Sequence, residues 1–443
     1  MNLKLKGRIL RRIISDFRLQ ILFCLLLITF ASLFVVFSIG TDVVNFGDGE
    51  DYLRSADSIF SSSGYLRDGL TWPFFRPPGY PFVIATLWKL SFSHSVIILK
   101  FFNIFLHIAS TYLVLMVVKR KHSNLAALLA SMLFGLNPFV LIPLSDIQTE
   151  PLTLFLFLFF CYFLSDESKK LHILKLSFVA ILLVAVRPEY LIILLSIIGL
   201  LLFKKIRTKK TIYQVCSILL TLTLGLSWWG IQNKEATGSF IPLTNATNYL
   251  LWNGSTEFIY NNYGFTLSYD QKFDSKQYTL IQNEISTKIK KWGPEYSNAT
   301  LGKKSQFWFS EYTHNIEVNP LRYLSKTLEK ATIFWRPFLN PRSHGLKISL
   351  VSLLVLLPLT FGMLLVLYRG RRQFFKDIFV KSYLAGLFGL TVIHALQMPD
   401  QRYKFPLLIP FSTILLAPAS LDLLSILFRR SFSYFQKRRN EKL

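Results

Sequence analysis

Charged side chains are scarce in this sequence of 443 residues. They make up 17% of it, whereas soluble domains usually carry about a quarter. Acidic residues are the scarcer sign, with 25 Asp and Glu against 50 Lys and Arg, so the formal net charge is +25. Several apolar runs are about as long as the roughly 20 residues that a helix needs to cross a bilayer. These runs exclude an ordinary soluble core and predict an integral membrane protein.

Cysteine is also rare, and the usual cofactor motifs are missing. Cys24, Cys161 and Cys216 all lie in apolar runs without metal-ligand spacing, so a disulfide framework or a zinc site is not indicated. The absence of CxxC, HxxEH, GxGxxG and Walker patterns argues against redox, zinc-protease and nucleotide-binding classes. An excess of basic residues can indicate nucleic-acid binding. Here most of them form short clusters between apolar runs, so we expect no nucleic-acid partner.

The apolar runs predict an all-α polytopic protein with about ten membrane-spanning helices. Short basic loops belong in the cytoplasm, and six basic clusters would then lie on one side, which places both termini in the cytoplasm. The count depends on the turn Arg187-Pro188-Glu189, because one long bent helix there would invert every later loop. The spans are predicted near residues 19–40, 95–118, 124–142, 149–165, 172–187, 189–203, 212–231, 347–368, 379–397 and 405–428.

This topology divides the chain into three regions. Residues 1–231 form an N-terminal transmembrane half with a first outer loop (41–94), which is expected to carry juxtamembrane helices. Residues 232–346 form an extracytoplasmic loop region before the eighth span. Residues 347–443 form C-terminal transmembrane helices and a basic cytoplasmic tail.

Ionisable residues gather on the outer side of this topology. Such residues cost about 2.5–3.5 kcal/mol each at membrane depth, so a group of both signs at span ends predicts a polar cavity there. A carboxylate in the cavity can take a proton from an acceptor hydroxyl. Arginines can hold a lipid phosphate by paired, charge-assisted hydrogen bonds. The group comprises Asp48, Glu50, Asp51, Arg76, Asp146, Glu150, Arg187, Glu189, Asp400 and Arg402.

Two motifs in the first outer loop carry a family resemblance. Asp48 and Tyr52 form an Asp-x-x-x-Tyr step, and residues 76–81 read Arg-Pro-Pro-Gly-Tyr-Pro. They resemble the GT-C membrane glycosyltransferases, in the bacterial branch related to dolichyl-phosphate-mannose protein mannosyltransferases and to the lipid A aminoarabinose transferase (glycosyltransferase family 39-like). The family usually has Arg-Asn where this chain has Gln232-Asn233. Further matches are Glu150, Arg187-Pro188, residues 228–233 and 240–243, Asn319 to Tyr323 with Lys330 and Trp335, and His394 with Arg402-Tyr403.

The resemblance implies roles for particular side chains. Asp48 would be the catalytic base; Glu50 and Asp51 remain alternatives, and an Asp at this place can also cap a helix. The donor phosphate would bind Arg187 and Arg402, with Arg76 and His394 beside them. Asp51, Tyr52, Glu150 and Tyr403 would position the acceptor or substrate. No cofactor is assigned, and the sequence leaves open whether neighbouring acids bind a divalent metal.

The expected function is transfer of a hexose or pentose from a polyprenyl-phosphate donor, such as an undecaprenyl phosphate sugar, to a lipid, glycan or protein acceptor. The reaction would occur on the periplasmic side of the cell inner membrane, and the resemblance implies inversion at the anomeric carbon. One alternative is a transporter or flippase of lipid-linked sugars, although no inverted repeat is evident. Another is a polymerase or ligase of lipid-linked glycans.

Overall fold

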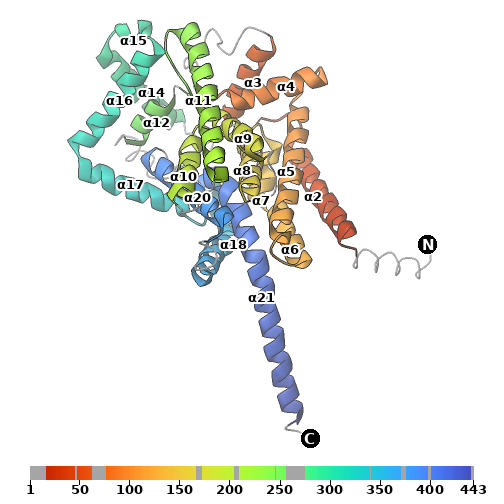
Figure 1. Cartoon of the computed structure of the whole chain (residues 1–443). Coiled ribbons are helices and arrows are strands. Elements are labelled where there is room, and N and C mark those ends of the chain that lie inside the picture. The colour runs from red at the N-terminus through yellow and green to blue at the C-terminus, as the bar shows by residue number, and fades with distance from the viewer. Residues whose placement is uncertain are drawn as a thin grey trace.

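The computed structural model describes residues 16–44, 47–61, 76–165, 172–203, 209–244, 246–255, 275–339, 341–370, 376–397 and 401–440. Within these residues every regular element is helical (Figure 1). This confirms the predicted all-α class.

Six of the described helices are long and apolar enough to cross a membrane. Each overlaps one of the predicted spans. A span in a bilayer is helical because its backbone groups find no water and must form their hydrogen bonds within the helix. They are α2 (Phe17–Ile39), α5 (Val96–Lys119), α11 (Lys209–Thr237), α18 (Pro341–Arg369), α20 (Ile378–Leu396) and α21 (Phe405–Asn440).

The predicted span at residues 124–142 is divided into helical pieces by a sharp bend. α6 (Asn124–Gly135) stops, and α7 (Pro138–Leu141) with η1 (Ile142–Ser145) continues at an angle of 59°. Pro138 cannot continue α6 because it lacks a backbone N–H. The side chain of Asn137 instead starts the new helix by accepting a hydrogen bond from the Phe139 amide at 3.0 Å.

The remaining three predicted spans are shorter apolar helices, α8 (Glu150–Leu164), α9 (His172–Val186) and α10 (Tyr190–Phe203). All ten predicted segments are thus helical, but these three are shorter than a usual span. The number of membrane crossings therefore stays a prediction, as does the side of the membrane that each loop faces.

A polar stripe on α5 fixes the ends of neighbouring helices. Lys100, Asn103 and His107 are buried and share one helix face, as their spacing of three and four predicts. Lys100 donates to the carbonyls of Gly40 and Val43 after α2, at 2.6 and 2.8 Å. Asn103 donates to the Asp146 carbonyl at 3.0 Å, and His107 pairs with the last carbonyl of α6. These groups therefore have a structural role.

The segment between α2 and α5 contains two helices that pack on each other, α3 (Gly47–Phe60) and α4 (Gly79–Ser91), as predicted. Gly79 lets α4 begin directly against the end of α9. A Cβ atom at Gly79 would lie 2.6 Å from the Ala185 carbonyl carbon, so a larger residue would push the helices apart. This close approach holds the preceding residues, including Arg76, beside α9.

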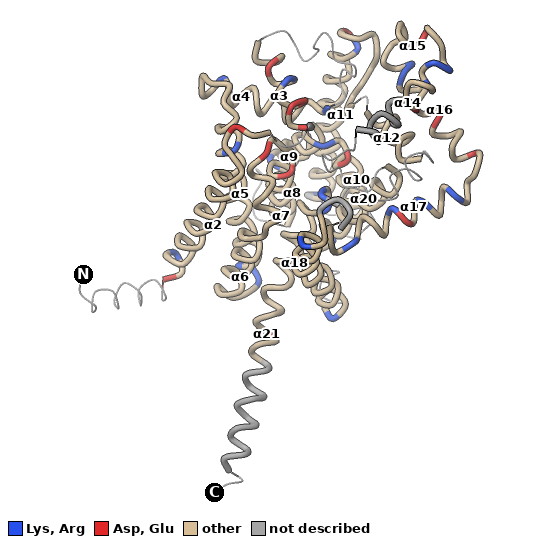
Figure 2. The backbone as a smooth tube through the Cα atoms, turned by 180° about the vertical axis from the view of Figure 1, so that it is seen from behind, with Lys and Arg blue, Asp and Glu red and all other residues tan. Residues whose placement is uncertain are grey.

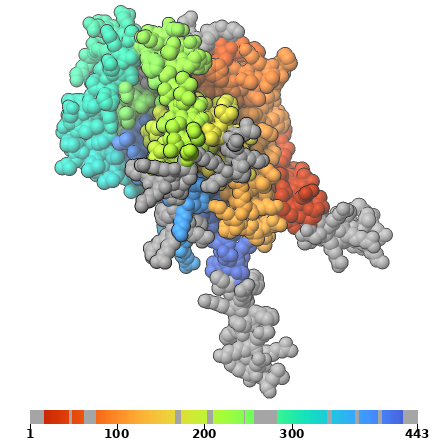
Figure 3. Space-filling view, viewed as in Figure 1, coloured from red at the N-terminus to blue at the C-terminus, as the bar shows by residue number. Residues whose placement is uncertain are grey.

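The second long segment folds into further helices. A cluster of Trp252, Ile285 and Trp308 joins three of them, and Trp229 of α11 packs with Ile241 and Leu301. Figure 3 shows these helices lying against α11 on one face of the molecule. Figure 1 places them at the same end as α3 and α4, opposite the projecting end of α21. They are α12 (Ala246–Ser255), α14 (Ser275–Trp292), α15 (Glu295–Asn298), α16 (Leu301–Val318) and α17 (Pro320–Trp335).

Candidate active site

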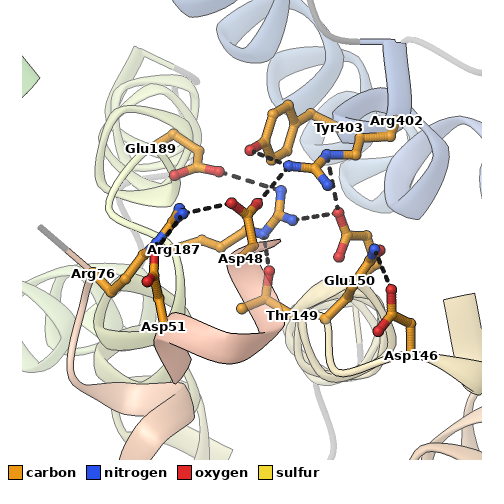
Figure 4. A network of polar contacts seen from close by, with 11 residues as sticks. Asp48, Asp51, Arg76, Asp146, Thr149, Glu150, Arg187, Glu189, Arg402 and Tyr403 are labelled. Carbon is orange, nitrogen blue, oxygen red and sulfur yellow. Dashed lines mark hydrogen bonds and ion pairs between the residues drawn. The ribbon is translucent and has the colours of Figure 1, made fainter. Parts of the chain in front are cut away.

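A cavity of about 320 Å³ lies where α3, α8 and the α9–α10 turn meet the short helix η2 (Gln401–Lys404). In Figure 2, Asp and Glu residues mark short stretches around α3, α8 and α10, with Lys and Arg between them. Figure 4 shows the side chains from these elements pointing toward one another. Eight of the nine predicted site residues line the cavity: Asp48, Tyr52, Arg76, Glu150, Arg187, His394, Arg402 and Tyr403.

Asp48 lies in the first turn of α3, where a carboxylate is favoured by the helix dipole. Its two oxygens bind two different arginines. Arg76 donates to Oδ1 at 2.5 Å, and Arg402 donates to Oδ2 at 2.8 Å. Burial would raise the pKa of Asp48, but the charges and hydrogen bonds of Arg76 and Arg402 outweigh it and hold that pKa below its usual value. Asp48 is therefore an anion at neutral pH.

Asp51, the ninth predicted residue, adjoins the cavity through Arg76. Its Oδ2 accepts hydrogen bonds from Nε and Nη2 of Arg76 at 3.3 and 3.2 Å, one helical turn after Asp48. Tyr52 lies on the other side, with the Arg76 guanidinium carbon 5.6 Å from its ring centre. Arg76 is thus held on two acids and an aromatic ring.

Arg187 forms a second, more deeply buried group. It contacts Glu150 Oε1 at 2.7 Å and Glu189 Oε1 at 3.4 Å, and donates to the Thr149 hydroxyl at 2.7 Å. Glu150 also lies 3.8 Å from Nε of Arg402, which links the two groups. Removing one partner from a buried ion pair leaves an uncompensated charge. Arg187 and Glu150 therefore hold the site together besides lining it.

Tyr403 and His394 form an aromatic wall. The guanidinium carbons of Arg187 and Arg402 lie 4.4 and 5.0 Å from the centre of the Tyr403 ring, and the Tyr403 hydroxyl accepts from Arg402 at 3.1 Å. His394 stacks between Tyr403 and Phe334, with ring centres 4.7 and 5.1 Å apart. Since both ring faces are covered, only the edge of His394 can meet a ligand.

Other predicted members fall outside the site. Glu50 is 60% exposed and pairs with Arg54 at 3.1 Å, one turn along the same helix. It is turned away from the cavity, so it is not an alternative base. Asp146 is buried and accepts from the next backbone amide, that of Ile147, at 2.8 Å. Asp400 lies outside the described residues.

Two lysines support the site from behind, and neither was predicted as a site residue. Lys330 of α17 is buried and donates to the carbonyls of Gly254, Leu396 and Gln397 at 2.9, 3.2 and 3.0 Å. Lys404 donates to the Phe334 and Arg336 carbonyls at 2.5 and 2.9 Å. Both lysines thus join α17 to the segment that carries His394 and Arg402. Lys330 was singled out only as part of the family resemblance, with no role assigned, and Lys404 was not singled out.

The acids of the site do not fit a divalent metal. Both oxygens of Asp48 and one oxygen of Asp51 accept hydrogen bonds from arginine guanidinium groups. A divalent cation binds through such carboxylate oxygens, so it would have to displace these guanidinium groups, whose positive charge repels it. Within the described residues, no three His, Cys, Asp or Glu side chains are grouped to hold a metal ion.

An apolar groove of about 500 Å³ begins beside the cavity. Pro77 and Leu243 line both, so the two hollows adjoin. The groove runs between α4, α9 and α11, and its side includes Phe82 and Trp228, which are 40% and 60% exposed. A charged cavity with an adjoining apolar groove suits a ligand with an anionic head and a long apolar chain.

No protein-family model matches the chain, and no curated protein matches it in sequence. Solved structures do resemble it. Archaeal oligosaccharyltransferase AglB from Archaeoglobus fulgidus, in complex with an inhibitory peptide and a dolichol-phosphate, matches with a TM-score of 0.51 and 12% identity, over 94% of this chain and 51% of that one. The apo oligosaccharyltransferase of Archaeoglobus fulgidus gives the same score and identity over 93% and 52%.

A weaker match is ArnT from Cupriavidus metallidurans bound to undecaprenyl phosphate, with a TM-score of 0.37 and 10% identity over 88% of this chain and 77% of that one. That score is too low to support a fold assignment. The chain spans about half the length of the oligosaccharyltransferase structures. At such low identity the likeness shows the fold alone, which is the GT-C fold predicted from the sequence.

Proposed function

We propose that this chain is a membrane glycosyltransferase that moves one sugar from a polyprenyl-phosphate donor to an acceptor hydroxyl on the periplasmic side of the cell inner membrane. The observation that carries the proposal is the position of Asp48, an anion held between Arg76 and Arg402 at the wall of a cavity. A base and a phosphate-binding pair are the two parts that this transfer needs.

In the proposed reaction, the acceptor oxygen bonds to the anomeric carbon of the sugar. Asp48 takes the proton of the acceptor hydroxyl as that bond forms. The bond between the anomeric carbon and the phosphate oxygen breaks, and its electron pair leaves with the lipid phosphate. Arg402 and Arg76, with Arg187 behind them, stabilise the growing negative charge by fixed hydrogen-bond donors. Inversion at the anomeric carbon follows if the acceptor attacks opposite the phosphate.

The pairing of Asp48 also imposes an order of binding. A carboxylate bonded to two arginines is a weak base, because both cations favour its ionised form. A donor phosphate would compete with Asp48 for Arg76 and Arg402 and take over their hydrogen bonds. Asp48 would then become a stronger base once the donor is bound. The donor therefore binds first, and its phosphate prepares the base for the acceptor.

The apolar groove supports a polyprenyl donor. Its walls continue from Pro77, the residue after Arg76, so a phosphate at Arg76 would place its chain at the groove entrance. An isoprenoid chain would bury apolar surface there, which is favourable by about 25 cal/mol per Å².

The proposal is tested by transfer from undecaprenyl-phosphate sugars in proteoliposomes, with a panel of hexose and pentose donors and an extract of cell-envelope acceptors. Asp48→Asn should lower the rate by a factor of about 100 or more, the usual contribution of a general base. Glu50→Gln is the matched control and should keep most activity, because Glu50 lies on the same helix but is 60% exposed and turned away from the cavity. Full transfer by the Asp48→Asn variant would show that Asp48 is not the base. Movement of the donor across the bilayer without release of lipid phosphate would indicate a flippase and contradict the proposed transfer.

A further inference from the structure

A second hollow, separate from the active-site cavity, lies between the end of α17 and the middle of α18. It encloses about 590 Å³ and shares no lining residue with the cavity. One wall is the last turn of α17 with Arg336 and Pro337. The other is one turn of α18 within its membrane-spanning stretch, formed by Thr360, Phe361 and Leu364.

The charge of Arg336 distinguishes this hollow from an ordinary apolar groove. Its guanidinium is half-buried, and its carbon lies 5.3 Å from the centre of the Phe338 ring. Within the described part of the chain no carboxylate pairs with it, and burial lowers the pKa of its guanidinium. Arg76, Arg187 and Arg402 each contact at least one carboxylate. A half-buried cation without an anion calls for an anionic partner.

Arg336 is also fixed in place. Lys404 donates to its backbone carbonyl at 2.9 Å, and the neighbouring Trp335 donates from its indole to Thr391 at 2.9 Å. These contacts fix the backbone that carries the Arg336 side chain. The opposite wall faces the bilayer, since Phe361 and Leu364 are 56% and 50% exposed on a membrane-spanning helix.

We propose that this hollow binds an anionic phospholipid of the surrounding membrane, with its phosphate on Arg336 and an acyl chain along Phe361 and Leu364. An arginine binds a phosphate by two parallel hydrogen bonds, and basic pockets between membrane helices are known to hold acidic lipid head groups. The donor is not the expected occupant, because the hollow shares no lining residue with the active-site cavity. The lipid would brace the segment whose Phe334 stacks on His394.

Native mass spectrometry of the full-length protein in neutral detergent tests the proposal. Phosphatidylglycerol should bind to the wild type with defined stoichiometry, and Arg336→Gln should weaken this binding about tenfold, the value of one charge-assisted contact. Arg322→Gln, an exposed arginine elsewhere on α17, is the matched control and should bind as the wild type does. Arg336→Lys should keep much of the affinity, which separates lost binding from lost folding.

Three outcomes would overturn the proposal. Phosphatidylglycerol could bind Arg336→Gln as tightly as the wild type. Phosphatidylcholine could bind as tightly as phosphatidylglycerol, which would indicate only the lipid that surrounds any membrane protein. Undecaprenyl phosphate could displace phosphatidylglycerol from Arg336 at equal concentration, which would assign the hollow to the substrate carrier. The experiment measures the binding of a phospholipid and not the transfer of a sugar. A negative result would therefore not contradict the proposed glycosyl transfer.

Discussion

At the scale of single residues, the site depends on how charges are paired. Asp48 balances two arginines, while Arg187 is balanced by Glu150 and Glu189. The first group is about one-fifth exposed and the second is nearly buried, so the first is open to exchange of partners and the second is not. A phosphate entering the cavity would therefore replace Asp48 and leave the Arg187 group intact.

This exchange predicts two different pH profiles. In the free protein Arg76 and Arg402 hold the pKa of Asp48 below its ordinary value, so its base form is present well into the acid range. Because kcat/KM reports the free protein, its acid limb should lie below the ordinary pKa of an Asp side chain. With the donor bound, the arginines are shared with phosphate and the Asp48 pKa rises, so the acid limb of kcat should lie at higher pH. Coincident limbs would contradict the exchange.

The residue types of the site could be predicted from the sequence, but their pairing could not. Asp48, Arg76, Arg187 and Arg402 stand out because they flank apolar runs and match motifs. Nothing in the sequence says that Asp48 touches Arg402, which is 354 positions away. Glu50 is also a carboxylate and lies two residues from Asp48. The two differ in the face of α3 that they occupy, because Asp48 lines the cavity and Glu50 is 60% exposed.

At the scale of elements, buried lysines join helices that lie far apart in the sequence. Lys330 binds the last carbonyls of α12 and α20 from its place on α17. Gly254 is needed at this junction, since a Cβ atom there would lie 2.4 Å from the Gln397 carbonyl oxygen. The apolar segments of the bundle were predictable from their length. This junction was not, because it depends on three segments meeting.

Lys330 should give the protein a pH-dependent stability. Burial lowers its pKa to about 7, from 10.5 in the unfolded chain. Between these values the unfolded state binds more protons, so stability rises with pH, by at most about 1.4 kcal/mol per pH unit. Below pH 7 Lys330 is protonated in both the folded and the unfolded state, so the folded state carries the full free-energy cost of burying the ammonium charge. Melting curves from pH 7 to 9 should show this rise in the wild type.

Lys330→Met should remove the rise and lower the melting temperature throughout, because three carbonyls lose their donor. Lys326→Met is the control, as Lys326 lies one turn earlier on α17 and pairs with Glu329 near the surface. A wild type and Lys330→Met variant with parallel pH profiles would show that Lys330 does not titrate in this range.

At the scale of the whole molecule, loops that were predicted to be cytoplasmic lie at a different end from α3, which was predicted to be periplasmic. Lys121 pairs with Asp377, so the α5–α6 turn lies beside the connection before α20, and both carry basic clusters. Figure 1 places α3, which carries Asp48, at the other end, in a loop that was predicted to be periplasmic. The geometry groups the loops, but which side each group faces still rests on the positive-inside rule.

Reporter fusions test that assignment. A reporter after Lys210 should read as cytoplasmic, and one after Asn298 in the second long segment should read as periplasmic. A fusion after Lys376 is a useful second point, because it follows a further basic cluster and should agree with Lys210. Inverted results for all three fusions would mean that the Arg187-Pro188-Glu189 turn does not separate two membrane spans.

The most direct test of the account is the binding of undecaprenyl phosphate to purified Asp48→Asn, measured beside wild type and Arg402→Ala. If the phosphate takes the arginines from Asp48, the Asn variant should bind at least as tightly as the wild type and yet show no transfer. Arg402→Ala should bind about tenfold more weakly. If Asp48→Asn loses lipid-phosphate binding together with transfer, Asp48 positions the arginines and is not the base that they release.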